Sequence, residues 1–139
     1  MADLDLLVPL FDAYRQFYRQ PSEPERASRF LRERFEQNQS VIFLSFAGAA
    51  PTGFTQLYPS FSSGAMAPIL ILNDLFVAPE ARRSGTGSAL LHAAAEYGRR
   101  AGALRLVLST EVTNTTAQSV YERLGWKRDT DFYVYQLAL

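Results

Sequence analysis

Cysteine is absent from this chain of 139 residues, histidine occurs once and the formal net charge is zero. Without cysteine there can be no disulfide, no thiol nucleophile and no cysteine-type zinc site. His92 has no partner ligand at zinc spacing, so we expect no metal. Fourteen basic residues balance fourteen acidic ones, which leaves no electrostatic footprint for nucleic acid. An apolar run of membrane length and a signal-peptide pattern are also absent, so we expect a cytoplasmic protein without a membrane partner.

The length and the composition are typical of one folded domain. A chain of 139 residues can bury a core, and its hydrophobic share of 47% argues against disorder. The sequence contains no internal repeat and no linker-like stretch. We therefore expect a single domain over residues 1–139.

Hydrophobic periodicity and turn residues predict a succession of helices and strands. The expected helices cover 3–20, 22–37, 88–101 and 115–124. The expected strands cover 41–46, 53–58, 69–77, 104–109 and, as a closing strand or hairpin, 132–139. This order predicts an α/β fold of the α+β type, with a mixed sheet covered by helices on both faces.

The stretch 72–91, LNDLFVAPEARRSGTGSALL, has the pattern of a strand, a tight glycine loop and a helix start. The loop consists of Arg82, Arg83, Ser84, Gly85, Thr86, Gly87 and Ser88. Unpaired N–H groups at a helix start, together with the positive end of the helix dipole, bind phosphate oxygens. Glycine lets the backbone approach an anion closely. We therefore predict that this loop binds a diphosphate.

Two other phosphate-binding motifs do not fit these residues. A P-loop needs Gly-Lys-Ser/Thr at its end, where this chain has Gly87-Ser88-Ala89. The third glycine of a dinucleotide fingerprint would fall at Leu90, and no second βαβ half follows. A glycine loop that only turns the chain remains an alternative.

The loop pattern R-x-x-G-x-G between a strand and a helix resembles the acyl-CoA loop of the GCN5-related N-acetyltransferases (GNAT family). Residues 114–126, NTTAQSVYERLGW, are similar to that family's later element N-x-x-A-x-x-x-Y-x-x-L-G-aromatic. The two motifs occur in the usual order across roughly half the chain. The resemblance implies a GNAT-like acyl-CoA N-acyltransferase fold, acetyl-CoA as cosubstrate and no metal.

One feature departs from the family. A GNAT fold normally opens with a strand before its first helix, and here only three residues precede that helix. The fold is therefore expected to lack the usual first strand, through truncation or a displaced start, or to leave the strand from Val41 as an exposed edge. Exposed edges invite pairing with another chain, so we expect a homodimer.

The resemblance implies transfer of an acetyl group to an amine, which must first lose a proton. A primary alkylammonium has a pKa of about 10.4, so a base or a water chain has to act. The diamine acetyltransferases, which this stretch resembles, have Glu-Asp where this chain has Asn73-Asp74. Asp74 is the first candidate for the base and Glu111 the second, and a structural role for Asp74 remains open. Since neighbouring strand residues face opposite ways, we expect only one of Asn73 and Asp74 to point at the substrate.

The resemblance also implies the remaining roles. The strand residues Leu75, Phe76 and Val77 would supply backbone groups to the thioester carbonyl and to the pantetheine amides. Tyr121 would protonate the departing CoA thiolate, since a tyrosine pKa of about 10 keeps the hydroxyl protonated at neutral pH. Asn114 would contact the cofactor, although a helix cap is the alternative. We expect no covalent enzyme intermediate and direct transfer in a ternary complex.

The acceptor is left open by the sequence. Side chains from the first helices and the strand loops would line its site, among them Tyr14, Tyr18, Tyr58 and Phe61, with core packing as the alternative for each. A small-molecule amine and a protein amine both fit. Two further hypotheses are a CoA-binding sensor or scaffold without turnover, which Asn73 favours, and a partner protein whose loop binds nothing.

Overall fold

A computed structural model describes residues 3–139 of the chain. The chain forms two units, Met1–Ser109 and Thr110–Leu139, and each is described by itself. The single domain expected over residues 1–139 therefore stays a prediction. None of the helices in residues 3–139 is both long and apolar enough to cross a membrane.

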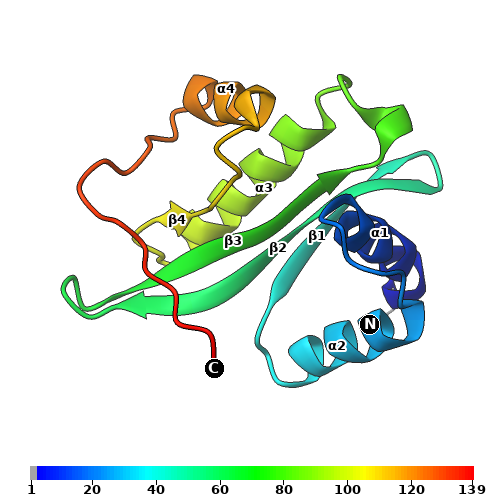
Figure 1. Ribbon diagram of the computed structural model, residues 1–139, viewed down its shortest axis with the longest axis horizontal. Coiled ribbons are helices and arrows are strands. Elements are labelled where there is room, and N and C mark those ends of the chain that lie inside the picture. Colours follow the sequence, from blue (N-terminus) through cyan, green and yellow to red (C-terminus); the bar gives the residue numbers. More distant parts are fainter. Residues whose placement is uncertain (1–2) are drawn as a thin grey trace. The chain divides into compact units, whose positions relative to one another are not determined.

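The first unit is built on a mixed sheet with helices on both faces, as predicted (Figure 1). Its elements are α1 (Leu4–Phe17), α2 (Pro24–Glu36), β1 (Val41–Ala47), β2 (Ala50–Ser62), β3 (Ala67–Val77), the 3-10 helix η1 (Pro79–Ala81), α3 (Thr86–Arg100) and β4 (Leu106–Val107). The strands lie in the order β1-β2-β3-β4. The first three are antiparallel neighbours, whereas β4 runs parallel to β3. A parallel pair needs a crossover connection, which α3 supplies.

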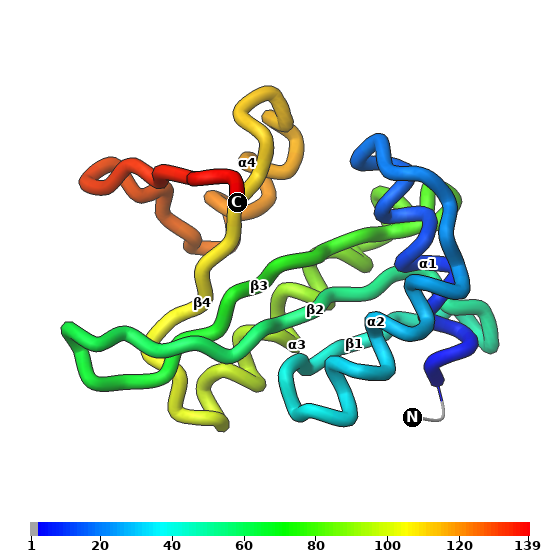
Figure 2. Tube along the Cα trace, turned by 60° about the horizontal axis from the view of Figure 1, so that its bottom comes forward, coloured from blue at the N-terminus to red at the C-terminus, as the bar shows by residue number. Residues whose placement is uncertain are grey.

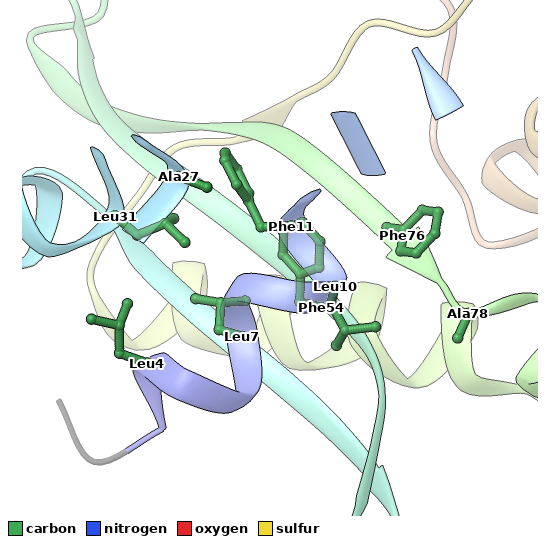
Figure 3. Packing of buried hydrophobic residues seen from close by; sticks show 9 residues of the cluster. All are labelled: Leu4, Leu7, Leu10, Phe11, Ala27, Leu31, Phe54, Phe76 and Ala78. Atoms are coloured by element: carbon green, nitrogen blue, oxygen red, sulfur yellow. The ribbon is translucent and has the colours of Figure 1, made fainter. Parts of the chain in front are cut away.

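Apolar residues of β2 and β3 form a core on each face of the sheet. Phe54 and Phe76 are cross-strand partners, and Phe54 packs on Phe11 of α1 with ring centroids 6.0 Å apart (Figure 3). The cluster under α1 and α2 comprises Leu4, Leu7, Leu10, Phe11, Ala27, Leu31, Phe54, Phe76 and Ala78. On the opposite face Leu70 lies beside Gly98 of α3. Two helices thus cover one face of the sheet and α3 covers the other (Figure 1).

A β-bulge interrupts the pairing of β2 with β3. Gln56 pairs with Asp74 and Leu57 pairs with Leu72, which leaves Asn73 as the extra residue on β3. A bulge changes the direction of the side chains on the bulged strand. Here Asp74 lies on the face covered by α1, whereas Asn73 is exposed. The two adjacent polar residues therefore differ in burial, although Asn73 Nδ2 still donates to Asp74 Oδ1 at 3.0 Å.

The strands differ in length from those predicted. β2 and β3 form a long hairpin whose turn is at 63–66 (Figure 2). The strands continue past the predicted bounds, because the polar residues near the turn also pair across the hairpin, as far as Ser62 and Ala67. β4 is shorter than the strand expected at 104–109, since it pairs with β3 only through Leu70–Leu106 and Ile71–Val107. Within the first unit, β3 therefore has no strand neighbour on this side from Leu72 to Val77.

The second unit contains one helix, α4 (Thr115–Arg123), and no strand within its residues 110–139. The side chain of Asn114 caps this helix by accepting a hydrogen bond from Ala117 N at 3.2 Å. The closing strand predicted at 132–139 is wrong for this structure. The alternation of aromatic and aliphatic residues is there, but a strand also needs a hydrogen-bonding partner. Most of these side chains are exposed.

Gly53 on β2 lies where the sheet packs closely against α3, so a substitution at this position tests that packing. A Cβ added at this position would lie 2.8 Å from the carbonyl oxygen of Phe76 and 3.2 Å from Leu90 Cδ1. Overpacking of this kind costs about 1–3 kcal/mol. We expect Gly53→Ala to lower the free energy of unfolding in urea by about that amount.

Gly64→Ala at the hairpin turn is the matched control, because a Cβ there would meet nothing within 4 Å. We expect this variant to unfold at the urea concentration of the parent protein. Equal stability of the two variants would contradict the packing described for Gly53.

Candidate active site

The glycine loop turns through two left-handed residues before α3 begins. Arg83 has φ 65° and Gly85, at the N-cap of α3, has φ 83°. Among residues 3–139, no group accepts a hydrogen bond from the backbone N–H of residues 83–88. The first N–H of this region that bonds within α3 is that of Ala89, which donates to Gly85 O at 3.0 Å. Arg82 N, in contrast, donates to Pro79 O at 3.4 Å. The loop thus presents a row of unpaired donors at the positive end of a helix dipole.

Within residues 3–139, no side chain of the loop accepts a hydrogen bond from this row of donors. Ser84 Oγ bonds the carbonyl oxygen of Ala81 and lies 2.9 Å from Thr86 Oγ1. Arg82 Nε donates to Val77 O at 3.0 Å. Its guanidinium carbon lies 5.7 Å from the ring centroids of both Phe17 and Phe76. Arg82 therefore packs on the end of β3 and on α1.

The open edge of β3 begins directly before the loop. Thr55 Oγ1 of β2 donates to Asp74 O at 2.8 Å, and the Phe76 carbonyl points toward Gly53 of β2. Since the backbone groups of a strand alternate between its two edges, those of Leu75 and Val77 face the open edge. Of the three strand residues expected to bond a cofactor, Leu75 and Val77 have this orientation. Phe76 instead directs its carbonyl into the sheet.

Asp74 is buried at the bulge and is 3% exposed. Gln56 Nε2 donates to its Oδ2 at 2.5 Å, and Asn73 Nδ2 donates to its Oδ1 at 3.0 Å. Within residues 3–139 no cationic side chain forms an ion pair with this carboxylate. Burial raises the pKa of Asp74, and hydrogen bonds from Gln56, Tyr14 and Asn73 partly oppose the shift. A buried carboxyl with a raised pKa and no counter-charge has the properties of a general base.

Two of the four aromatic residues expected near the acceptor lie beside Asp74. The Tyr14 hydroxyl donates to Asn73 O at 3.4 Å and lowers the pKa of the neighbouring Asp74 carboxyl. Burial raises the pKa of Tyr58 to about 12, with a further contribution from Asp74 and an opposing one from Arg34. Burial raises the pKa of Tyr14 as well. Both hydroxyls therefore stay protonated at neutral pH.

The other two aromatic residues differ from each other. The Tyr18 ring packs edge-on against Tyr14 with centroids 5.1 Å apart. Phe61 is 78% exposed and lies five residues beyond Gln56 on β2. The structure thus brings Tyr14, Tyr18 and Tyr58 together and leaves Phe61 on the hairpin. Gln56 was not predicted, and the only sequence signal for it is a polar residue within an apolar strand.

The remaining predicted residues belong to the second unit. Tyr121 is half-buried on α4, with its ring centroid 6.0 Å from that of Trp126. Asn114 begins the same helix as its cap, which agrees with the structural alternative for this residue. Glu111 is exposed, and its carbonyl oxygen accepts a hydrogen bond from Asn114 N at 3.0 Å.

The described residues offer no metal site. Residues 3–139 contain no group of three or more His, Asp or Glu side chains that could hold a metal ion. His92 is an exposed residue of α3. Its position agrees with a surface role.

Comparisons with known proteins agree on one family. The model of the acetyltransferase (GNAT) family matches residues 7–126. The chain is 48% identical to YhfO of Bacillus subtilis, an uncharacterized N-acetyltransferase, over 98% of this chain and 91% of that protein. It is 31% identical to a probable acetyltransferase of Haemophilus influenzae, over 99% of this chain and 92% of that protein.

Solved structures extend the likeness. The crystal structure of a probable acetyltransferase has 44% sequence identity and a TM-score of 0.94, and covers 100% of this chain and 93% of its own. The aminoglycoside N-acetyltransferase AAC(6')-Iy in complex with CoA shares the fold, with a TM-score of 0.82 at 19% identity over 99% of this chain and 90% of its own. The chain therefore belongs to the acetyltransferase (GNAT) family and is an acyltransferase.

Proposed function

We propose that this enzyme transfers the acetyl group of acetyl-CoA to a primary amine by direct transfer in a ternary complex. The row of unpaired N–H groups at residues 83–88, directly after the open edge of β3, carries the proposal. Acetyl-CoA supplies an acetyl group already activated as a thioester. The family as a whole uses acetyl-CoA, and we infer that this chain uses it too.

The loop would bind the diphosphate of the cofactor through backbone donors. Residues 83–88 offer N–H groups with no partner in the described part of the chain. The positive end of the α3 dipole adds to the attraction for an anion. Arg83 is exposed beside these donors and would contribute its charge. Arg82, whose Nε bonds Val77 O, would act on the β3 side of the loop.

The open edge of β3 would bind the pantetheine arm as an added strand. The backbone groups of Leu75 and Val77 face this edge, and no strand of the first unit covers them. A backbone N–H from this stretch would also stabilise the negative charge that develops on the thioester carbonyl oxygen. Fixed donors of this kind need no reorganisation when the charge appears.

Asp74 is the general base that we propose. Its raised pKa makes it a better proton acceptor than an ordinary carboxylate. It directly precedes Leu75, whose backbone faces the open edge of β3. Asn73 cannot take up a proton, but it bonds Asp74 and keeps the carboxylate oriented. The proton would reach Asp74 directly or through one water. Glu111 and a longer water chain are the alternatives.

Tyr121 keeps the role of general acid that the family motif implies. Replacement by Phe removes the hydroxyl but leaves the ring beside Trp126. We expect Tyr121→Phe to lower kcat by roughly 10²-fold, the low end of the effect of a proton donor. The measurement is thiol release from acetyl-CoA at saturating amine. Tyr97→Phe on α3 is the matched control and should keep the parent rate. Equal rates for the two variants would show that Tyr121 is not the general acid.

The experiment that tests the proposed function is a panel of primary amines mixed with enzyme and acetyl-CoA. Thiol release that depends on both the enzyme and an amine supports the transferase. Small aliphatic amines, amino acids, aminoglycosides and lysine peptides belong in the panel, because the acceptor is not identified. Absence of release with every class would leave the alternative, a non-catalytic CoA-binding sensor or scaffold. Asn73, where the diamine enzymes have Glu, favours that alternative.

We propose further that the chain is a homodimer. β1 lies at the edge of the sheet with β2 as its only strand neighbour in the described residues, and its free edge can pair with a second copy. Light scattering on the purified protein tests the mass in solution.

The family match over 7–126 spans both units and supports one domain. A cytoplasmic location stays a prediction, which cell fractionation would test.

A further inference from the structure

Gln56 is a fully buried polar residue that stands directly opposite Asp74 in the sheet. It is 0% exposed, and its side chain reaches across the strand pair to the Asp74 carboxylate. Phe54, two residues earlier on the same face, belongs to the apolar core. A buried amide amid apolar neighbours is costly unless its polar atoms are bonded.

Only one end of this amide is bonded. Nε2 donates to Asp74 Oδ2 at 2.5 Å, whereas Oε1 has no partner among residues 3–139. Asp74 also has spare capacity. An ionised carboxylate accepts about four hydrogen bonds, and within residues 3–139 the side chains that donate to it are those of Gln56 and Asn73. The Tyr14 hydroxyl lies near it and lowers its pKa. Two adjacent acceptors, one on each residue, are therefore left for a donor that the chain does not supply.

We propose that Gln56 is a positioning residue of the acceptor site, which holds Asp74 through Nε2 and accepts an N–H of the acceptor amine through Oε1. This inference rests on the proposed function. A primary ammonium has three N–H groups and can meet both acceptors at once. One proton passes to Asp74 while its electron pair stays on nitrogen for the attack, and a remaining N–H stays on Gln56. An alcohol has a single O–H, so the pair selects amines over alcohols.

Gln56 and Asp74 form a buried pair that lies one side chain beneath the surface. Tyr14 from α1 and Tyr58 from β2 lie beside Asp74 and are themselves only half-buried. Asn73 from β3 is exposed and bonds the same carboxylate. The charge of Arg34 from α2 acts on Tyr58 and lowers its pKa. Within residues 3–139 these are the titratable, charged and amide groups beside Gln56 and Asp74, and none of them donates to Gln56 Oε1.

Two substitutions separate the two ends of the amide. Gln56→Met is similar in size and removes both hydrogen bonds. Gln56→Glu keeps an acceptor at the Oε1 position and removes the amide donor to Asp74. Gln37→Met, at the exposed end of α2, is the matched control. Thermal melting of each variant shows which ones are folded, and the Glu variant keeps the test available if the Met variant is not.

The pH profile of kcat/KM reports the bond to Asp74. The donor on Gln56 lowers the pKa of that carboxyl, so its loss raises the pKa, and the base is then protonated at a higher pH. We expect the acid limb of the profile to move to higher pH in both Gln56 variants and to stay in place in Gln37→Met. A limb that does not move in either Gln56 variant overturns the first half of the proposal.

The binding of amines reports the bond to Oε1. With a primary amine from the active panel, we expect KM to rise about tenfold in Gln56→Met, the effect of one lost hydrogen bond, but not in Gln56→Glu. The trimethylated form of the same amine has no N–H and serves as a competitive inhibitor. Its Ki should be the same in the parent and in Gln56→Met.

The comparison of KM with Ki distinguishes a contact to the amine from a structural effect. If KM and Ki rise together, or if KM does not change in Gln56→Met, the N–H contact is overturned and Oε1 bonds water alone. Either result leaves the proposed function standing, because the parent enzyme still acetylates the amine. If the parent releases no thiol with any amine, the proposed function itself fails.

Discussion

Asp74→Asn lowers kcat/KM for the amine by roughly 10²–10⁴-fold, the expected loss when a general base is removed. The reason is the environment of Asp74 at the bulge. The carboxylate is 3% exposed and forms no ion pair within residues 3–139. Burial raises its pKa, so it binds a proton more readily than an ordinary aspartate. The new amide has nearly the same shape but cannot accept the proton.

The pH dependence follows from the direction of this shift. Asp74 is active as a base only when ionised, so parent activity should fall as the pH drops through the raised pKa of this carboxyl. That fall should occur above the usual value of 3.8. In Asp74→Asn the small remaining activity should lack this limb. Asp5→Asn, on the exposed side of α1, is the matched control and should keep both the rate and the limb.

Stability provides a second, opposite readout. A group whose pKa is raised by folding favours the folded state when protonated, and this contribution is lost as the pH rises through the raised pKa. At neutral pH the ionised Asp74 therefore destabilises the fold. In Asp74→Asn a flip of the Gln56 amide would let its unpaired Oε1 accept from the new amide. We expect an unchanged or higher melting temperature together with lower activity, and a large loss of both would show that Asp74 is structural.

Gly85→Val weakens the binding of CoA by more than tenfold in calorimetry. Gly85 has φ 83° at the N-cap of α3, a conformation that costs other residues about 1–2 kcal/mol and a β-branched residue most of all. The loop would relax to relieve this strain, and the N–H groups of residues 83–88 would then point away from the diphosphate. The helix itself should persist, since only its first turn is affected.

Gly48→Val is the matched control for this prediction. Gly48 lies in the turn between β1 and β2 with φ 62°, and a Cβ there meets nothing within 4 Å. The substitution imposes the same kind of backbone strain outside the glycine loop. We expect a similar loss of stability with unchanged CoA affinity. If both variants bound CoA equally, the backbone of the loop would not be the diphosphate site.

The parts of the fold that depend on local sequence could be predicted. The strand, the glycine loop and α3 follow each other within about twenty residues, and the left-handed turn needs the glycine that the sequence has at position 85. α1 and α2 follow from helical spacing and from Pro24 at the first turn of α2. In each case neighbouring residues contain the information.

The parts that depend on register could not be predicted. The bulge at Asn73 arises from how β3 aligns with β2, and that alignment places Gln56 opposite Asp74. Arg82 Nε donates to Val77 O and its guanidinium lies near the rings of Phe17 and Phe76, contacts that residue type alone does not indicate. Alternation predicted a strand at 132–139, where the chain provides no partner within the second unit. Contacts between distant segments decide all three.

The most direct test of the central claim is an amide NMR titration of the protein with CoA and, separately, with pantetheine, which lacks the diphosphate. We expect CoA to shift the backbone N–H signals of Gly85, Thr86, Gly87 and Ser88, whose donors have no partner within residues 3–139. Pantetheine should instead shift the signals of Leu75 and Val77 and leave those of the loop unchanged. Loop signals that stay in place at saturating CoA would show that these N–H groups do not bind the diphosphate.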